Sequence, residues 1–287
     1  MTTQRYFSRI VRLSSLTGAL GLAALLSNSS PASPHAELLA DRAALDREIN
    51  MSVNPASLFL ERADLQRQLG HLDDALRDYE RARKFGAANG SVSRGRARVL
   101  MEKQDFSGAA AAASAALSSD PGDGAARALR GEAHRALGLW RLAADDFGTA
   151  AALVPRRPLD LIFSQAESLA AVPENGRVGA LAALEAEIER RGPASSLLLA
   201  AFEHERALGR TNDALARLDA LRAQGWSQAR HGLLRGDVLM EAGGLAEARA
   251  AWRSGLEGLD AMPNRRRTTR AALRLRGELL ERLGGTR

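Results

Sequence analysis

The sequence predicts an all-α protein built as a solenoid of antiparallel helix pairs. Of its 287 residues, 45% are hydrophobic and only 4% are aromatic, and alanine and leucine dominate. Such a composition, with few β-branched runs, favours helices over strands. A pattern of small, bulky and turn residues also recurs about every 34 residues along most of the chain. A chain with this periodicity stacks similar units instead of folding into separate globular domains.

The clearest unit is Gly124–Arg157. Gly131 and Ala143 are small residues at which two helix axes can approach closely, and Phe147 is bulky enough to fill the space beside them. Gly138 marks the turn between the two helices, and a proline ends the second helix because it lacks an N–H group. The unit therefore predicts two antiparallel helices of about fourteen residues each.

The same positions recur along the chain at a fixed spacing. The alanines that open each second helix follow one another by 34, 34, 37, 34 and 34 residues, and they are Ala75, Ala109, Ala143, Ala180, Ala214 and Ala248. Four residues after each alanine stand Tyr79, Ala113, Phe147, Leu184, Leu218 and Trp252. Twelve residues before the alanines, in the units that keep register, stand Ala63, Ala97, Gly131, Phe202 and Gly236. The turns hold Gly70, Gly138, Gly209 and Gly243, and Gln104 takes that place once.

This grid resembles the tetratricopeptide repeat over roughly Ala56–Met262, in five units of six. The resemblance implies a right-handed superhelix whose first helices line a concave groove. The unit from Pro158 departs from the pattern: it carries three extra residues, placed most easily in the Val172–Arg177 turn, and is interpreted as a joint. The expected organisation is a signal peptide (1–36), a capping helix (37–55), three repeats (56–157), the divergent repeat (158–194), two repeats (195–262) and a basic capping helix (263–287).

The first 36 residues have the features of a secretory signal peptide. Three arginines precede the apolar run Leu16–Leu26, and a small, polar stretch follows in which cleavage is expected after Ala32 or Ala36. A retained membrane anchor is the alternative, but the apolar run is short for a bilayer core of about 30 Å. The sequence therefore predicts a bacterial periplasmic or secreted protein.

The net charge of +6 is concentrated at the two ends of the chain. Residues 1–36 carry +3 and residues 263–287 carry +6, which leaves residues 37–262 at about −3. The repeats therefore do not form a basic surface for nucleic acid, and no nucleic-acid partner is expected. The chain has no cysteine, which excludes disulfides, thiol catalysis and cysteine-based metal sites.

The C-terminal segment predicts one final helix, Asn264–Leu283, that caps the solenoid. Its inward stripe consists of Ala272, Leu275, Leu279 and Leu283, while another face holds Arg267, Arg270 and Arg274. These arginines suggest weak contact with an anionic surface. The alternative function is therefore a tether that binds anionic lipid or polymer through this helix.

The sequence predicts no enzyme, no cofactor and no metal site. Motifs for zinc hydrolases, serine hydrolases, phosphate-binding loops and calcium loops are missing, and the five histidines are scattered. Two acidic pairs, Asp73–Asp74 and Asp145–Asp146, are interpreted as solvated carboxylates near helix N-termini. A scaffold that binds other proteins or peptides is the function that remains.

The resemblance to the family also implies which residues face the groove. They are Leu60, Asp64, Arg67, Arg94, Arg98, Glu132, Arg135, Glu203, Arg206 and Asp237. Three acids are followed three residues later by an arginine, as in Glu132 and Arg135, and such pairs share a helix face. Arg94 has no acid three or four residues away, whereas Glu102 can pair with Arg98. We therefore expect Arg94 to be the arginine most available to a ligand carboxylate.

Overall fold

The computed structural model describes residues 33–285, and this part of the chain consists of helices joined by turns and loops. The signal-peptide prediction falls almost wholly on residues outside the described part. The helices, in chain order, are α1 (Pro34–Met51), α2 (Ala56–Gln68), α3 (Leu72–Lys84), α4 (Asn89–Glu102), α5 (Phe106–Ser119), α6 (Gly124–Ala136), α7 (Trp140–Leu153), α8 (Leu159–Ala170), α9 (Gly176–Arg191), α10 (Ser195–Ala207), α11 (Thr211–Ala223), α12 (Gln228–Glu241), α13 (Leu245–Asp260), α14 (Asn264–Arg267) and α15 (Arg270–Gly284).

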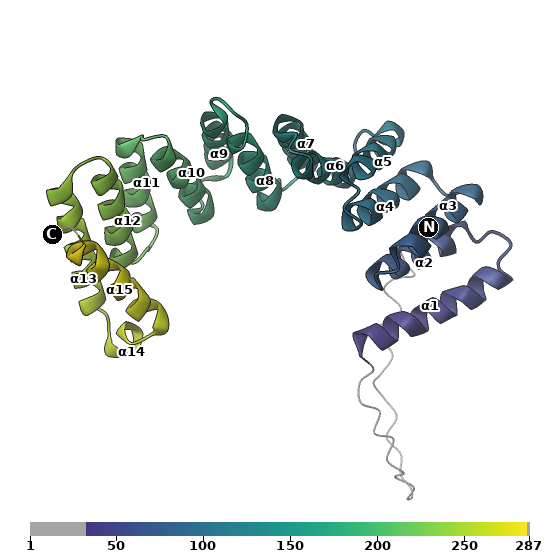
Figure 1. Ribbon diagram of the computed structural model, residues 1–287, viewed down its shortest axis with the longest axis horizontal. Coiled ribbons are helices and arrows are strands. Elements are labelled where there is room, and N and C mark those ends of the chain that lie inside the picture. The colour runs from purple at the N-terminus through teal and green to yellow at the C-terminus, as the bar shows by residue number, and fades with distance from the viewer. Residues whose placement is uncertain (1–32, 286–287) are drawn as a thin grey trace, which may run out of the picture.

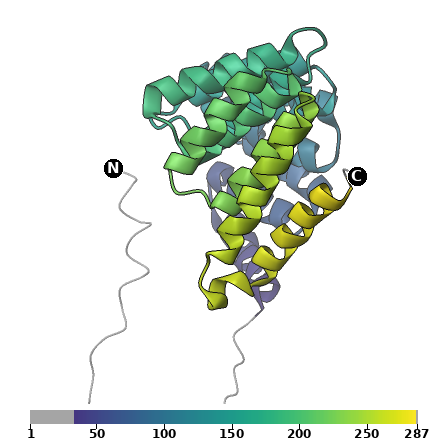
Figure 2. The same cartoon turned by 90° about the vertical axis from the view of Figure 1, so that its left-hand side faces the viewer.

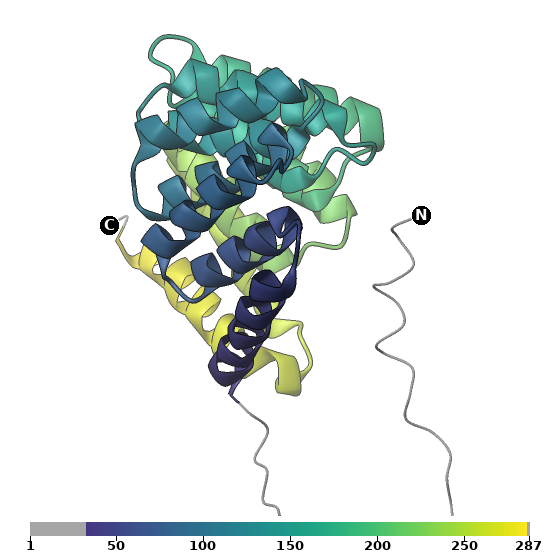
Figure 3. The same cartoon turned by 90° about the vertical axis from the view of Figure 1, so that its right-hand side faces the viewer.

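The helix pairs form an arched α-solenoid, as the sequence predicts. Figure 1 shows the pairs following one another along an arch, with α1 at one foot and α15 at the other. Seen from the two ends, successive pairs are rotated relative to one another, which gives the stack its superhelical form (Figures 2 and 3). Consecutive first helices also contact each other directly, α2 with α4 and α4 with α6, so they line the inner side of the curvature. The inner side is the concave surface discussed below.

The turns inside the repeats depend on a left-handed residue. The backbone φ angle is positive at Gly70 (79°), Gly138 (73°), Gly209 (68°) and Gly243 (86°), a region that glycine enters without steric cost. Gln104 adopts the same conformation, with φ of 60°, at the one turn where glycine is missing. The turn geometry is therefore retained in this repeat in spite of the side chain, which confirms the position assigned to Gln104.

In the pairs α6–α7 and α12–α13, a glycine on the first helix packs against a large side chain on the second. A methyl group added to Gly131 would lie 3.1 Å from Cε1 of Phe147, and one added to Gly236 would lie 2.3 Å from Nε1 of Trp252. The alanines that open the second helices are buried, with 1% exposure or less. The predicted register is thus confirmed, and it sets how closely the helices approach.

The divergent repeat, α8 and α9, places its extra residues differently from the prediction. The turn between these helices, residues 171–175, is two residues longer than the turn at 137–139. The third extra residue lies in the loop before α8, at 154–158, which is one residue longer than the loop at 120–123. As a result Ala166, which is 2% exposed, occupies the small-residue position of this repeat.

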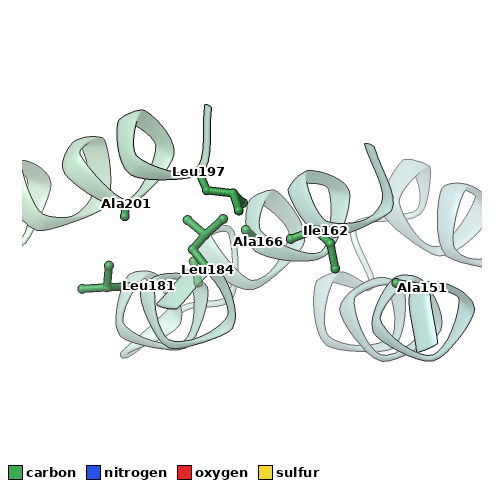
Figure 4. Close-up of a cluster of buried hydrophobic side chains, with 8 residues drawn as sticks. Ala151, Ile162, Ala166, Leu181, Leu184, Leu197 and Ala201 are labelled. Carbon is green, nitrogen blue, oxygen red and sulfur yellow. The ribbon is translucent and has the colours of Figure 1, made fainter. Parts of the chain in front are cut away.

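The divergent repeat packs against both of its neighbours through one apolar core. The cluster in Figure 4 brings together Ala151 from α7, Ile162 from α8, Leu184 from α9 and Leu197 from α10. All four side chains are at most 1% exposed. The cores of the repeats before and after α8 and α9 are therefore joined without a polar gap.

The two ends of the solenoid consist of helices outside the regular pairs, α1 at one end and α14 and α15 at the other. The prediction of a single C-terminal helix is wrong. The helix ends at Arg267 of the short α14, and a second helix, α15, begins after its N-cap residue Thr269. The Thr269 hydroxyl accepts a hydrogen bond from the N–H of Ala272 at 3.3 Å, which caps the new helix. The inward stripe of α15 is confirmed, with Leu279 fully buried and Leu275 packed against the same core. At the other end, α1 packs on α2.

Replacing Gly131 by leucine tests the packing register. We expect Gly131→Leu to lower the free energy of unfolding by about 1–3 kcal/mol, because the side chain is forced against the buried ring of Phe147. His71→Ala, at an exposed turn, is the control and is expected to change it by less than about 0.5 kcal/mol. Denaturant unfolding measures both variants, and the reverse ranking would contradict the register.

Candidate functional site: the concave surface

The ten residues predicted to face the groove lie on five first helices, α2, α4, α6, α10 and α12. Most of them are half-buried, and Glu203 is exposed. The structure places most of their charges in ion pairs or hydrogen bonds within the solenoid. The concave surface is therefore a largely neutralised network, and its binding chemistry depends on the groups that remain without a partner.

Arginines at one repeat position reach across to the next first helix. Arg67 pairs with Glu102 at 2.5 Å, and Arg206 pairs with Glu241 at 2.5 Å, and in both cases the partners are 35 positions apart in the sequence. The hydrogen bond from Arg206 lowers the pKa of Glu241. The stabilisation from this pair is therefore present at neutral pH and is lost as the pH falls through that lowered pKa. The predicted pairing of Glu102 with Arg98 is wrong, because Glu102 is bound by Arg67.

Two acids of the groove accept hydrogen bonds from the bulky residue of their own repeat. The Tyr79 hydroxyl donates to Asp64 at 2.5 Å, and the Trp252 indole N–H donates to Asp237 at 3.2 Å. Burial and the Asp64 carboxylate raise the pKa of the Tyr79 hydroxyl, which therefore stays protonated. Asp237 also pairs with Arg282 of α15 at 3.0 Å. These bonds tie the groove-facing acids to the aromatic core beneath them.

Of the three predicted acid–arginine pairs, only Glu132 and Arg135 form within one helix. Arg135 also lies 3.6 Å from Glu167 of α8, so it too connects neighbouring first helices. The predicted pairs of Asp64 with Arg67 and of Glu203 with Arg206 are wrong, because each arginine pairs with a glutamate of the next first helix. A neighbour one repeat away is closer in space than the sequence spacing suggests.

Arg94 is paired, contrary to the expectation from sequence. Its guanidinium lies 2.5 Å from the carboxylate of Asp123, which comes 29 residues later at the start of α6. Asp123 also caps α6 by accepting the N–H of Ala126 at 2.9 Å. Burial opposes ionisation of Asp123, but these hydrogen bonds together hold its pKa below the usual range. Arg94 therefore has a structural role and is not free for a ligand.

Arg98 is the arginine that remains available. It is half-exposed, and no carboxylate lies within ion-pair distance of it in the part of the chain that the structure describes. Its charge is felt at the Tyr79 hydroxyl, which places it close to the Asp64–Tyr79 pair. Among the ten groove residues it is thus the one cation whose charge is not matched by an ion pair between residues 33 and 285.

The sequence reasoning missed a second set of charges, buried between the helices. Asp78 and Asp146 are 1% and 3% exposed, and they accept bidentate hydrogen bonds from Arg62 and Arg130, respectively. Asp146 also bonds Nδ1 of His134 at 3.0 Å, so its interpretation as a solvated acid is wrong. The signal was present, because each arginine and its acid lie 16 residues apart. The same spacing occurs in two units separated by two repeat lengths.

Between residues 33 and 285, no cluster of three or more histidine and carboxylate side chains has the arrangement of a metal site. None of the helices in that range combines the length and apolarity that crossing a bilayer requires. The candidate site is therefore the concave surface around Arg98.

The antiparallel pairs, the left-handed turn and the small-to-large packing define an α-solenoid of helix-pair repeats. Residues 60–123 and 94–158 match the family model described as tetratricopeptide repeat, so α2 to α7 contain tetratricopeptide repeats. Proteins with these repeats are in general scaffolds without catalytic activity. A comparison with curated proteins found no match.

Solved structures share the fold over most of the chain. The C-terminal part of a repeat-containing protein from Cytophaga hutchinsonii is 14% identical, with a TM-score of 0.63, over 83% of this chain and 94% of that one. A chain of the Naa15/Naa10 complex bound to HypK-THB is 13% identical, with a TM-score of 0.56, over 86% of this chain and 37% of that one. At these identities the likeness supports the solenoid fold along the chain.

Charge reversal at Arg94 and at Arg98 distinguishes the paired arginine from the unpaired one. We expect Arg94→Glu to lower the free energy of unfolding by about 1–3 kcal/mol, because it leaves the mostly buried Asp123 facing a second carboxylate. Arg98→Glu breaks no ion pair and is expected to cost less than about 0.5 kcal/mol. Thermal unfolding of the two variants measures the difference, and equal losses would contradict the assignment.

Proposed function

We propose that this chain is an exported scaffold that binds an extended segment of another protein on its concave surface. Tetratricopeptide repeats generally bind protein or peptide partners, and the matched repeats α2 to α7 include the part of the groove that holds Arg98. The first helices line the inner side of the arch (Figure 1), and their partly exposed groove residues form a row along it. An extended segment can follow such a row from one repeat to the next.

The unpaired Arg98 is the observation that carries this proposal. A guanidinium presents a planar fork of N–H donors that binds a carboxylate through two parallel hydrogen bonds. The neighbouring Arg67 and Arg94 are already neutralised by Glu102 and Asp123, so they do not compete for the same ligand group. The proposed partner therefore places an aspartate, a glutamate or a terminal carboxylate at Arg98.

Apolar side chains beside Arg98 give the ligand a second kind of contact. Met101 lies three residues further along α4 and is half-buried, and Leu60 is half-buried on the preceding first helix. Partly exposed apolar groups next to a charged anchor contribute affinity when a ligand side chain covers them. The preferred ligand thus combines one carboxylate with apolar residues close to it in an extended chain.

The proposal includes export, with cleavage after Ala32. The Ser33 hydroxyl accepts a hydrogen bond from the N–H of Ala36 at 3.3 Å and caps α1. A mature chain that begins at Ser33 keeps this cap, whereas cleavage after Ala36 removes the cap and the first turn of the helix. The cap, together with the three arginines and the apolar run before it, supports the earlier of the two predicted sites.

A tether to an anionic surface is a second candidate with weaker support. Arg265, Arg266 and Arg270 are exposed and without an ion pair in the described chain, but the Arg267 side chain donates to the Asp260 carbonyl and Arg274 pairs with Glu278. At about 1 kcal/mol for each basic residue near an anionic membrane, three arginines give only weak attachment. The groove is therefore the better supported binding surface.

Selection from a library of extended peptides tests the groove. We expect the selected peptides to carry an acidic residue, and we expect Arg98→Glu to weaken their binding by about tenfold or more, because it places a carboxylate against a carboxylate. The matched control is Arg141→Glu, an exposed arginine on the second helix α7. Equal binding by the native chain and Arg98→Glu would contradict the groove site.

Mass spectrometry of the native protein tests export. We expect the intact mass of a chain that starts at Ser33, isolated from the periplasm or the medium, because this site preserves the cap of α1. A full-length chain recovered from the soluble cytoplasmic fraction would contradict export. A full-length chain recovered with membranes would instead support the retained anchor.

A further inference from the structure

The helix at the N-terminal end, α1, occupies the position of the second helix of a repeat, and the first helix of that repeat is not present in the described chain. In two of the regular repeats an arginine of a first helix pairs with an acid 16 residues earlier, on the preceding second helix: Arg96 of α4 with Glu80 of α3 at 3.9 Å, and Arg235 of α12 with Asp219 of α11 at 3.0 Å. Arg62 of α2 makes the same pair with Asp46 of α1 at 2.6 Å, again 16 residues apart. In the described chain, no first helix precedes α1 to complete this unit.

The helix at the C-terminal end, α15, is the opposite case. Arg276 pairs with Asp260 of α13 at 2.5 Å, and these residues too are 16 apart, which places α15 at the position of a first helix. It contacts both α13 and the first helix α12, as α4 contacts α3 and α2. In the described chain, no second helix follows α15 to complete its unit. The solenoid thus ends in two half-repeats of opposite type, visible at the front of Figures 3 and 2.

An open acidic cleft lies where the missing first helix would pack. It has a volume of about 630 Å³ between α1 and α2, and its lining includes Asp41, Glu48, Glu61 and Asp64. It also includes Gln68, which lies one repeat length before Glu102, the residue that pairs with an arginine of the preceding first helix. In the repeat register, the cleft therefore corresponds to the position where a first helix would pack. Its acidic lining fits a helix that carries basic residues.

The outward face of α15 has the exposed apolar side chains and the small residue that packing into this cleft requires. Leu273 and Leu280 are 55% and 53% exposed, with Gly277 between them. The ion pairs of Arg235 and Arg276 set a register in which Gly277 corresponds to Gly236, the glycine covered by the indole of Trp252. A methyl group added to Gly277 would meet no atom within 4 Å. The slot that holds a bulky residue in a complete repeat is thus empty at α15.

The charges of the two ends are complementary. Arg270 is exposed without an ion pair, and Arg274 is 83% exposed beside Leu273, paired only within its own helix. The cleft at the other end presents four carboxylates, of which Asp41, Glu48 and Glu61 are exposed. Facing surfaces of opposite charge favour association and specify orientation, and they do so less in high salt.

We propose that α15 of one molecule packs into the α1–α2 cleft of a second copy of this chain. The contact joins the two half-repeats into one complete helix pair, with α15 as the first helix and α1 as the second. Leu45, at the position of Tyr79 in the repeat register, then faces Gly277 of the neighbouring copy. Because this head-to-tail contact uses different surfaces on the two copies, it leaves an open cleft at one end and an open α15 at the other. Copies therefore add into open chains.

Measurement of the molar mass of the full chain by light scattering tests the assembly. We expect the average mass to rise beyond that of a dimer as the protein concentration increases, and to fall towards that of a monomer in high salt. A monomer at every concentration would overturn the proposal, and so would a mass that stops at the dimer. A monomer that binds phosphatidylglycerol vesicles through α15 would overturn it in favour of the tether.

A substitution at Gly277 separates assembly from folding. Gly277→Gln adds a side chain where no atom lies within 4 Å, so the melting temperature of the monomer is expected to stay within error of the native value. The side chain fills the slot that the neighbouring copy needs, and the concentration at which chains form is expected to rise by about tenfold or more. Unchanged assembly by this folded variant would overturn the proposal.

Exchange of charges between the two surfaces gives the sharpest test. The cleft variant replaces the three exposed acids, Asp41→Arg, Glu48→Arg and Glu61→Arg, and the helix variant is Arg270→Glu with Arg274→Glu. Each variant alone has two surfaces of like charge and is expected to remain monomeric. Mixed in equal amounts, they offer a basic cleft to an acidic helix and the reverse, so assembly is expected to return. Failure of the mixture of folded variants to assemble would overturn the head-to-tail arrangement.

Discussion

The arch depends on the close approach of two helices where a small residue of the first meets a large residue of the second. At Gly236 a Cβ atom would occupy the same space as the indole of Trp252, and at Gly131 it would press on the ring of Phe147. In these two pairs the contact sets how closely the helices approach, because interiors at normal packing density have no room for an alternative. The turn residue, the curvature and the line of inner side chains all follow from repeating that pair.

The packing could be predicted from the sequence because it depends on residues within one repeat. The spacing of Ala75 and its equivalents, the turn position of Gln104 and the stripe of α15 were all readable from periodicity, and the structure confirms them. The charges could not be assigned in this way. Arg94 pairs with Asp123 of the next repeat and Asp146 is buried beneath Arg130, because a long side chain pairs with whatever lies beside it in space. The break before α15 was missed as well, since a threonine cap is a weak local signal.

The concave surface illustrates why a candidate site in a solenoid is defined by what the structure leaves unused. The family resemblance placed ten residues in the groove, and most of them serve the contacts between repeats or between a helix and the core. Arg98 is set apart by its neighbours, since Glu102 and Asp123 are occupied by Arg67 and Arg94. At the ends of the stack, α1 and α15 each keep the ion pair to the adjacent repeat, but in the described chain neither has the other helix of its own unit.

The ion pairs that join consecutive first helices make the resistance of the arch to bending depend on the ionic strength of the solvent. Arg67 with Glu102, Arg135 with Glu167 and Arg206 with Glu241 all cross the inner side of the curve, where they are half-exposed and open to screening by salt. Such pairs contribute little to the free energy of folding, yet they hold neighbouring first helices together along the inner side of the arch. We expect a higher ionic strength to weaken these pairs while the apolar cores stay intact, so that the arch becomes easier to bend without unfolding. The work of bending it to fit a ligand is thereby set by the medium as well as by the sequence.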